Sequence, residues 1–158
     1  MAPRYQEIRT DRIPEVVLDS GIRVRLVCGR VGSVTGPVTD IVTDPQYLDV
    51  SMPPQAHFSH PVIPGYTVLA YVVDGRGSFA ESVARPVLES GTLVAFEDGD
   101  RVVAASGDDA FRFLLISGKP IGEPVAWQGP IVMNTRAELD QAFMEYRDGA
   151  FIKPADGR

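Results

Sequence analysis

The stretch at residues 62–75, VIPGYTVLAYVVDG, constrains the fold of this chain more than any other. Pro64 and Gly65 predict a bend, and the apolar run at 66–73 that follows has the length and the β-branched and aromatic content of a buried strand. The DGRG sequence at 74–77 predicts a tight hairpin, because glycine readily adopts the positive φ that such turns need. We therefore expect a buried strand that turns back at Ser78 and Phe79.

Short segments in which apolar and polar residues alternate recur between turn-forming residues along the chain. Strands are predicted at residues 16–18, 22–30, 47–52, 85–88, 92–96, 101–105 and 111–117. Turns are predicted at residues 29–37, 89–91, 97–100 and 106–109. With 15 glycines and 13 prolines in 158 residues, this pattern favours an all-β domain of the sandwich or small-barrel type.

One helix is predicted near the end of the chain, from about Arg136 to Arg147. Thr135 with Glu138 three residues later forms a capping box, and Gly149 is suited to the left-handed conformation that ends a helix. The apolar residues of the helix fall on one face, which predicts packing on the barrel or on a partner. This face contains Leu139, Ala142, Phe143 and Tyr146.

The net charge of −6 argues against nucleic-acid binding, which needs a clustered excess of Lys and Arg. The start of the chain lacks the apolar core of a secretion signal, and no apolar run reaches the length of a membrane span. The only cysteine, Cys28, lies in an apolar stretch and is expected to be a small buried side chain in a reducing cytosol. We expect a cytoplasmic protein that binds neither nucleic acid nor membrane.

His57 and His60, the two histidines, are the first candidates for metal binding. Their separation of three residues places them on opposite faces of a strand, so that a regular strand cannot offer both to one ion. The favoured interpretation is a pair of surface or rim histidines with local hydrogen bonds.

Several motifs together resemble the C-terminal half of the pirin family, within the cupin superfamily. They are PRYQEI at 3–8, IPGY at 63–66, AYVVDGRG at 70–77, DGD at 98–100 and GPIVMNTRAELDQAFMEYRDG at 129–149. The resemblance implies a small cupin-type double-stranded β-helix barrel, or jelly roll, with one C-terminal helix. It also implies a division into an arm at 1–14 like the pirin interdomain linker, a barrel at 15–128, the GPIVMNT segment and helix at 129–153, and a tail at 154–158.

The resemblance further predicts where a cupin would hold its metal. Counting back from Gly75 places the glutamate ligand at Val68, and the two histidines at Val62 and Pro64 or at Pro61 and Ile63. The histidine of the second motif falls on Val102. Apolar side chains offer none of the nitrogen or oxygen ligands that iron or manganese needs. We therefore expect no cofactor, because pirins hold their iron in the N-terminal barrel, which is missing here.

The same register predicts the side chains that point into the barrel. These are Tyr66, Val68, Ala70 and Val72, with Val102 and Ala104 opposite. A packed core is the favoured interpretation, since small barrels fill their interiors with side chains. The alternative is a pocket for a small apolar or aromatic ligand, lined by these residues and by Trp127, with Tyr47 or Tyr71 as further candidates.

The sequence thus predicts a metal-free assembly or small-molecule-binding module. Pirins pack their two barrels together, which implies a homodimer or a complex with a separate N-terminal pirin-type barrel. The predicted assembly surface contains Tyr5, Ile8, Leu139, Phe143, Tyr146 and Phe151. The alternative is a quercetin 2,3-dioxygenase-like oxidoreductase, alone or jointly with such a barrel. It would hold iron or another divalent transition metal through His57 or His60.

Overall fold

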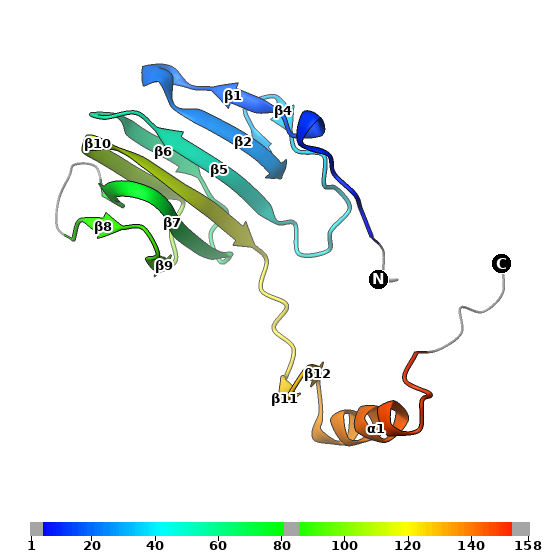
Figure 1. Ribbon diagram of the computed structural model, residues 1–158. Helices are drawn as coiled ribbons and strands as arrows, with labels where there is room; N and C mark the ends of the chain where they lie inside the picture. Colours follow the sequence, from blue (N-terminus) through cyan, green and yellow to red (C-terminus); the bar gives the residue numbers. More distant parts are fainter. Residues whose placement is uncertain (1–4, 81–85, 153–158) are drawn as a thin grey trace. The chain divides into compact units, whose positions relative to one another are not determined.

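The computed structural model describes residues 5–80 and 86–152 (Figure 1). The chain divides into two compact units, Met1–Pro120 and Ile121–Arg158. The second unit begins before the sequence-based boundary at residue 128. The predicted tail at 154–158 and Arg85 of one predicted strand lie outside the described residues.

The first unit is built almost entirely from antiparallel strands, as the alternating pattern predicts. The strands are β1 (Glu15–Val17), β2 (Arg23–Cys28), β3 (Arg30–Val31), β4 (Val34–Thr35), β5 (Gln46–Met52), β6 (His57–Pro61), β7 (Thr67–Ser78), β8 (Leu88–Glu89), β9 (Leu93–Ala95) and β10 (Arg101–Gly118). Two short 3₁₀ turns, Thr10–Arg12 and Asp19–Gly21, flank β1.

An eight-stranded sheet follows the order β1-β2-β5-β10-β7-β8, with β6 paired to β10 and β9 paired to β7. Figure 1 shows β10 between β5 and β7. The first part of β10, residues 101–105, pairs with β6, and residues 111–117 pair with β5. The single long strand β10 therefore pairs with β6 in its first part and with β5 in its last part.

The predicted hairpin at residues 74–77 is wrong, because β7 continues through these residues to Ser78. Gly75 does have a positive φ of 73°, but it uses this conformation where the register against β10 is irregular. A side chain at Gly75 would overlap the carbonyl oxygen of Ala110. The glycine therefore permits a close approach of two strands, and residues 78–79 do not begin a return strand.

The predicted turn at residues 106–109 is also wrong. These polar residues lie inside β10, where the pairing with β7 shifts register between Ser106 and Phe111. Turn-forming residues mark this irregularity because they tolerate the local departure from regular pleating. β6, which was not predicted, pairs with β10 directly before this point.

The core lies on the inward face of the first unit and follows the predicted two-residue period. Inward residues of β2, β5, β7 and β10 are almost inaccessible to solvent: Val24, Leu26, Leu48, Val50, Ala70, Val72, Phe113 and Leu115 are each 0% exposed. Phe79 packs edge-on against Phe96 and Phe113, at ring-centroid distances of 5.2 and 5.0 Å. The prediction of a buried Cys28 is confirmed.

The second unit contains a small hairpin and the predicted helix. β11 (Ala126–Gln128) pairs with β12 (Ile131–Met133), and α1 spans Arg136–Arg147. Both hydrogen bonds of the capping box between Thr135 and Glu138 are present, and Gly149 has a φ of 70°. The core of this unit consists of Ile131, Leu139 and Ala142. Within residues 5–80 and 86–152, no helix has the length and apolar character needed to cross a membrane.

Candidate functional site

The positions that the resemblance assigns to the metal ligands of a cupin lie in or beside the packed core of the first unit. Val62, Val68 and Val102 are 7%, 5% and 2% exposed and belong to one apolar cluster. The backbone carbonyl of Val68 accepts a hydrogen bond from the Phe96 amide at 3.0 Å. Pro64 is exposed in the connection between β6 and β7. Three of these four positions thus carry buried hydrocarbon side chains.

The structure separates His57 and His60 as the sequence predicts, on opposite faces of β6. The prediction of a surface or rim position is wrong for His60, which is only 5% exposed, whereas His57 is exposed. Phe58 stacks on the His60 ring at a centroid distance of 6.1 Å. The alternation of β6, with Phe58 and His60 inward and Val62 buried directly after the strand, was the signal that would have placed His60 in the interior.

His60 is held by one well-defined polar contact. Its Nε2 lies 2.7 Å from Oε1 of Gln46, at the start of β5. An amide oxygen can only accept, so the hydrogen bond places a proton on Nε2. Burial lowers the pKa of His60 below its usual value of 6.5, which favours the neutral ring. The imidazole therefore ties β6 to the start of β5.

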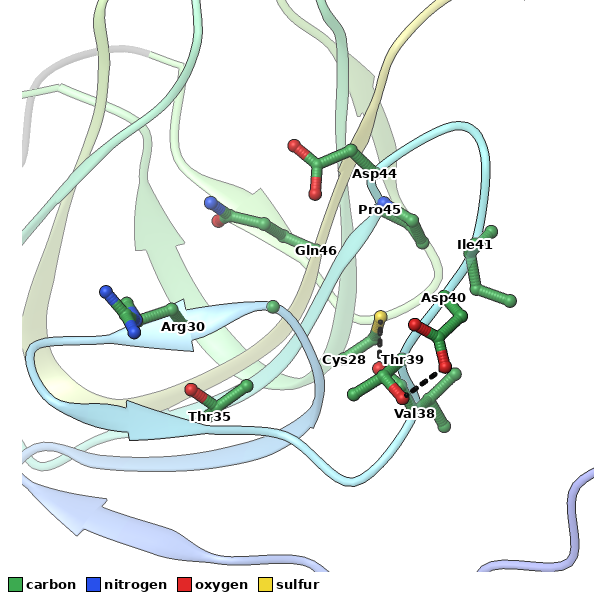
Figure 2. Close-up of a pocket in the computed structure, with 11 residues that line it drawn as sticks. Cys28, Arg30, Thr35, Val38, Thr39, Asp40, Ile41, Asp44, Pro45 and Gln46 are labelled. Atoms are coloured by element: carbon green, nitrogen blue, oxygen red, sulfur yellow. Dashed lines mark hydrogen bonds between the residues drawn. The ribbon is translucent and has the colours of Figure 1, made fainter.

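Gln46 also lines a cavity of about 450 Å³ (Figure 2). The cavity is lined by Cys28, Gly29, Arg30, Thr35, Val38, Thr39, Asp40, Ile41, Asp44, Pro45 and Gln46. The lining comes from the end of β2, the β3–β4 hairpin and the loop that leads into β5. It combines the Cys28 thiol with charged side chains of both signs, Arg30, Asp40 and Asp44.

Hydrogen bonds between the lining residues limit the reactivity of the side chains in this cavity. The Cys28 thiol donates to the carbonyl of Val38 at 3.1 Å, and burial raises the pKa of Cys28. Thr39 donates to the Asp40 carboxylate at 3.2 Å. Because the thiolate is the nucleophilic form of cysteine, a raised pKa makes Cys28 a poor nucleophile. The cavity is thus a polar recess without an activated group.

The predicted pocket-lining residues do not converge on one cavity. Val68, Ala70, Val72, Val102 and Ala104 are core residues, each 7% exposed or less. Tyr66 departs from its predicted inward position because β7 begins only at Thr67. The Tyr66 hydroxyl donates to Asp44 at 3.2 Å, and partial desolvation together with this carboxylate raises the pKa of Tyr66.

Trp127 lies on β11 in the second unit, where it is 74% exposed. Its indole nitrogen donates to the carbonyl of Gly129 at 2.6 Å. No group of three or more His, Cys, Asp or Glu side chains is arranged to hold a metal ion within the part of the chain that the structure describes.

The predicted assembly residues fall into two groups. Tyr5, Tyr146 and Phe151 are 89%, 69% and 39% exposed, and Ile8 is partly exposed. The prediction that Leu139 belongs to an assembly surface is wrong, because Leu139 is 1% exposed and lies in the core of the second unit. Phe143 packs against the same core. An apolar groove of about 620 Å³ runs between β12 and α1, lined by Pro130, Ile131, Val132, Met133, Phe143, Tyr146 and Phe151.

A further surface, which the sequence prediction missed, lies on the outward side of the main sheet. Six apolar side chains from β5, β10, β7 and β9 face away from the core, and we call them the outer sheet face: Tyr47, Leu69, Tyr71, Leu93, Leu114 and Ile116. The apolar runs at 68–73 and 113–116 could have indicated this apolar outward face, because neither run contains the alternating polar residues of a strand with one exposed face.

Comparison with known proteins agrees with this architecture. Residues 47–152 match the family described as the Pirin C-terminal cupin domain. A pirin-like protein of Caulobacter vibrioides is 38% identical over 95% of this chain and 53% of its own length. Human pirin is 32% identical over 92% of this chain and 50% of its own length. The chain therefore spans about half the length of these curated relatives.

Solved structures give the same result. The crystal structure of quercetin 2,3-dioxygenase from Acinetobacter baumannii superposes with a TM-score of 0.82 at 25% identity, covering 94% of this chain and 50% of that one. Strand content, strand order and the single helix are thus those of a cupin. Together with the family match, they show that the chain belongs to the pirin family and matches its C-terminal cupin domain.

Proposed function

We propose that this domain is a metal-free, cytoplasmic cupin that acts as a binding and assembly module and is not a catalyst by itself. One observation carries the proposal: Val62, Val68 and Val102, at three of the positions expected for metal ligands, are buried together in the apolar core. A transition metal in a cupin needs imidazole nitrogens and carboxylate oxygens at coordination distance. Three buried valines supply neither.

His60 does not restore the missing ligands. It is the buried histidine nearest to these positions, since it pairs across the sheet with Val102. Its Nε2 is used by the hydrogen bond to Gln46, and a single imidazole binds a divalent ion weakly without further ligands. The proposed role of His60 is therefore to join β6 to β5.

Metal analysis tests this proposal directly. The purified chain is incubated with ferrous iron or manganese, desalted, and examined by elemental analysis, alongside His60→Ala and His57→Ala variants. We expect substoichiometric metal in all three proteins. One equivalent of metal in the wild type that is lost in His60→Ala and kept in His57→Ala would overturn the proposal.

The proposed partners are a second copy of the chain or a separate N-terminal pirin-type barrel. Support comes from the outer sheet face, which is apolar although it faces away from the core. A small apolar or aromatic ligand is the other proposed partner. It would use a recess outside the core, because the interior is filled by side chains.

A second candidate function is an oxidoreductase of the quercetin 2,3-dioxygenase type, in which this domain works jointly with a separate metal-binding barrel. The likeness to the Acinetobacter baumannii enzyme over half of that chain favours it. Oxygen uptake with quercetin, measured with the chain alone and with a pirin N-terminal barrel added, distinguishes the two. Activity that requires both parts would support joint catalysis, and activity of the chain alone would contradict the metal-free proposal.

A further inference from the structure

We infer that the cavity at the end of β2 binds a small zwitterion, a molecule that carries both an ammonium group and a carboxylate. This inference extends the binding role proposed above to a polar ligand with a site of its own, and it rests on that role. The cavity volume of about 450 Å³ lies within the range of small-molecule sites.

Backbone hydrogen bonds hold the loop that forms one wall of the cavity, between β4 and β5. Near the start of this loop, the amide of Val38 donates to the carbonyl of Val27 at 3.1 Å. Near its end, the carbonyl of Thr43 accepts from the amide of Lys119 at 2.7 Å. The loop is thus tied to the sheet at both ends. A site that is already formed loses less conformational freedom when a ligand binds.

Gln46 supplies a hydrogen-bond donor in a fixed position. Its Oε1 accepts from Nε2 of His60 at 2.7 Å. Gly29 lies close against the same side chain, since a Cβ at Gly29 would be 2.8 Å from Cγ of Gln46. The Nε2 of Gln46 donates to no residue within 5–80 and 86–152. The amide is therefore held in place while its two hydrogens remain available to a carboxylate.

Charges of both signs on the lining select a zwitterion. Arg30 is exposed and forms no ion pair with the described residues, so its guanidinium can bind a carboxylate. The Asp44 carboxylate accepts from the Tyr66 hydroxyl at 3.2 Å, which leaves further acceptor positions for an ammonium group. Asp40 adds a second negative charge. The two aspartates would repel a simple carboxylate, and a simple amine would leave Arg30 without a partner.

Nuclear magnetic resonance titration of the full chain at about pH 7 tests the inference. Figure 2 shows Arg30 apart from Asp40, so the probes are two zwitterions of different length, 4-aminobutanoate and 6-aminohexanoate. We expect at least one of them to cause saturable shifts in the backbone amides of residues 28–46 and in the side-chain amide of Gln46. Butanoate, butylamine, hexanoate and hexylamine match these probes but carry one charge each. They should bind about tenfold or more weakly, since each lacks one charge-assisted hydrogen bond.

Two variants remove one charge each from the cavity. Arg30→Gln and Asp44→Asn are each expected to weaken zwitterion binding by about tenfold. Arg30→Gln should leave the weak binding of hexylamine unchanged, because that probe has no carboxylate. Arg12→Gln is the matched control, since Arg12 is also exposed but does not line the cavity, and it should bind like the wild type. Circular dichroism checks that each variant is folded.

Three results would overturn the inference. They are the absence of saturable shifts at residues 28–46 with both zwitterions, equal affinity for a matched probe of single charge, and an equal loss of affinity in Arg12→Gln and Arg30→Gln. A chain that binds neither zwitterion and also lacks metal would overturn this site alone. Stoichiometric metal in the elemental analysis would overturn the proposed function.

Discussion

A histidine buried among apolar side chains links the stability of this domain to pH. His60 is 5% exposed and its pKa is lowered by burial, so the folded state binds fewer protons than the unfolded chain at mildly acidic pH. The contribution of the neutral ring is complete above pH 6.5, the usual value for an unfolded chain. It is lost as the pH falls from there toward the lowered pKa of the folded state.

The variant His60→Leu is therefore expected to show a stability difference that depends on pH. At about pH 8 it should lose about 1 kcal/mol through the missing hydrogen bond to Gln46. At about pH 5.5 the difference from the wild type should shrink, because only the wild type pays for protonation of the buried ring. Urea denaturation at both pH values measures this. A difference between His60→Leu and the wild type that stays constant between the two pH values would refute the linkage.

At the level of single residues, the sequence predicted which apolar side chains are buried better than it predicted the contacts of polar side chains. Val68 and Val102 could be assigned by counting from glycines, and both are buried as their apolar character requires. The hydrogen bond of His60 to Gln46 could not be predicted, since it depends on the pairing of both β6 and β5 with β10 across a large sequence separation.

At the level of elements, Gly75 shows that a glycine that predicts a hairpin turn can instead permit the close approach of two strands, here β7 and β10. Gly75→Ala should cost at least about 2 kcal/mol, because a left-handed φ costs alanine about 1–2 kcal/mol and overlap with the Ala110 carbonyl adds to it. Gly32→Ala is the matched control, since Gly32 also has a positive φ but nothing lies within 4 Å of its missing Cβ. Equal losses in chemical denaturation would contradict this role for Gly75.

The elements with a clear period were predicted well. β2, β5 and α1 follow from the two-residue alternation and from the capping box at Thr135. β7 and β10 were broken too early, because polar and glycine residues that usually form turns lie here inside long strands at points of irregular pairing. Only the partner strand decides whether such residues turn the chain or remain in the sheet.

At the scale of the molecule, the division into two units predicts separate unfolding. Trp127, the only tryptophan, reports on the second unit, whose core contains Leu139. Leu139→Ala should lower the unfolding midpoint followed by tryptophan fluorescence, by a loss of about 2–5 kcal/mol. The midpoint followed by circular dichroism of the sheet should stay unchanged.

Leu115→Ala, in the core of the first unit, is the matched substitution and should shift the sheet signal. If both probes moved together in both variants, the two units would unfold as one. The sequence-based division placed the boundary at residue 128 and not at residue 120, because the segment between β10 and β11 carries ordinary loop residues that do not mark where the second unit begins.

The three buried valines also have an evolutionary consequence. Under the proposed function, gaining a metal centre at these positions would require several substitutions together. A single Val68→Glu change would bury a carboxyl group with no ligand partner, and a single Val102→His change would bury an imidazole in the same way. Each intermediate would lose a few kcal/mol, a large share of the 5–15 kcal/mol that stabilises a typical domain. Selection for stability alone would thus oppose the stepwise gain of a metal centre at these positions.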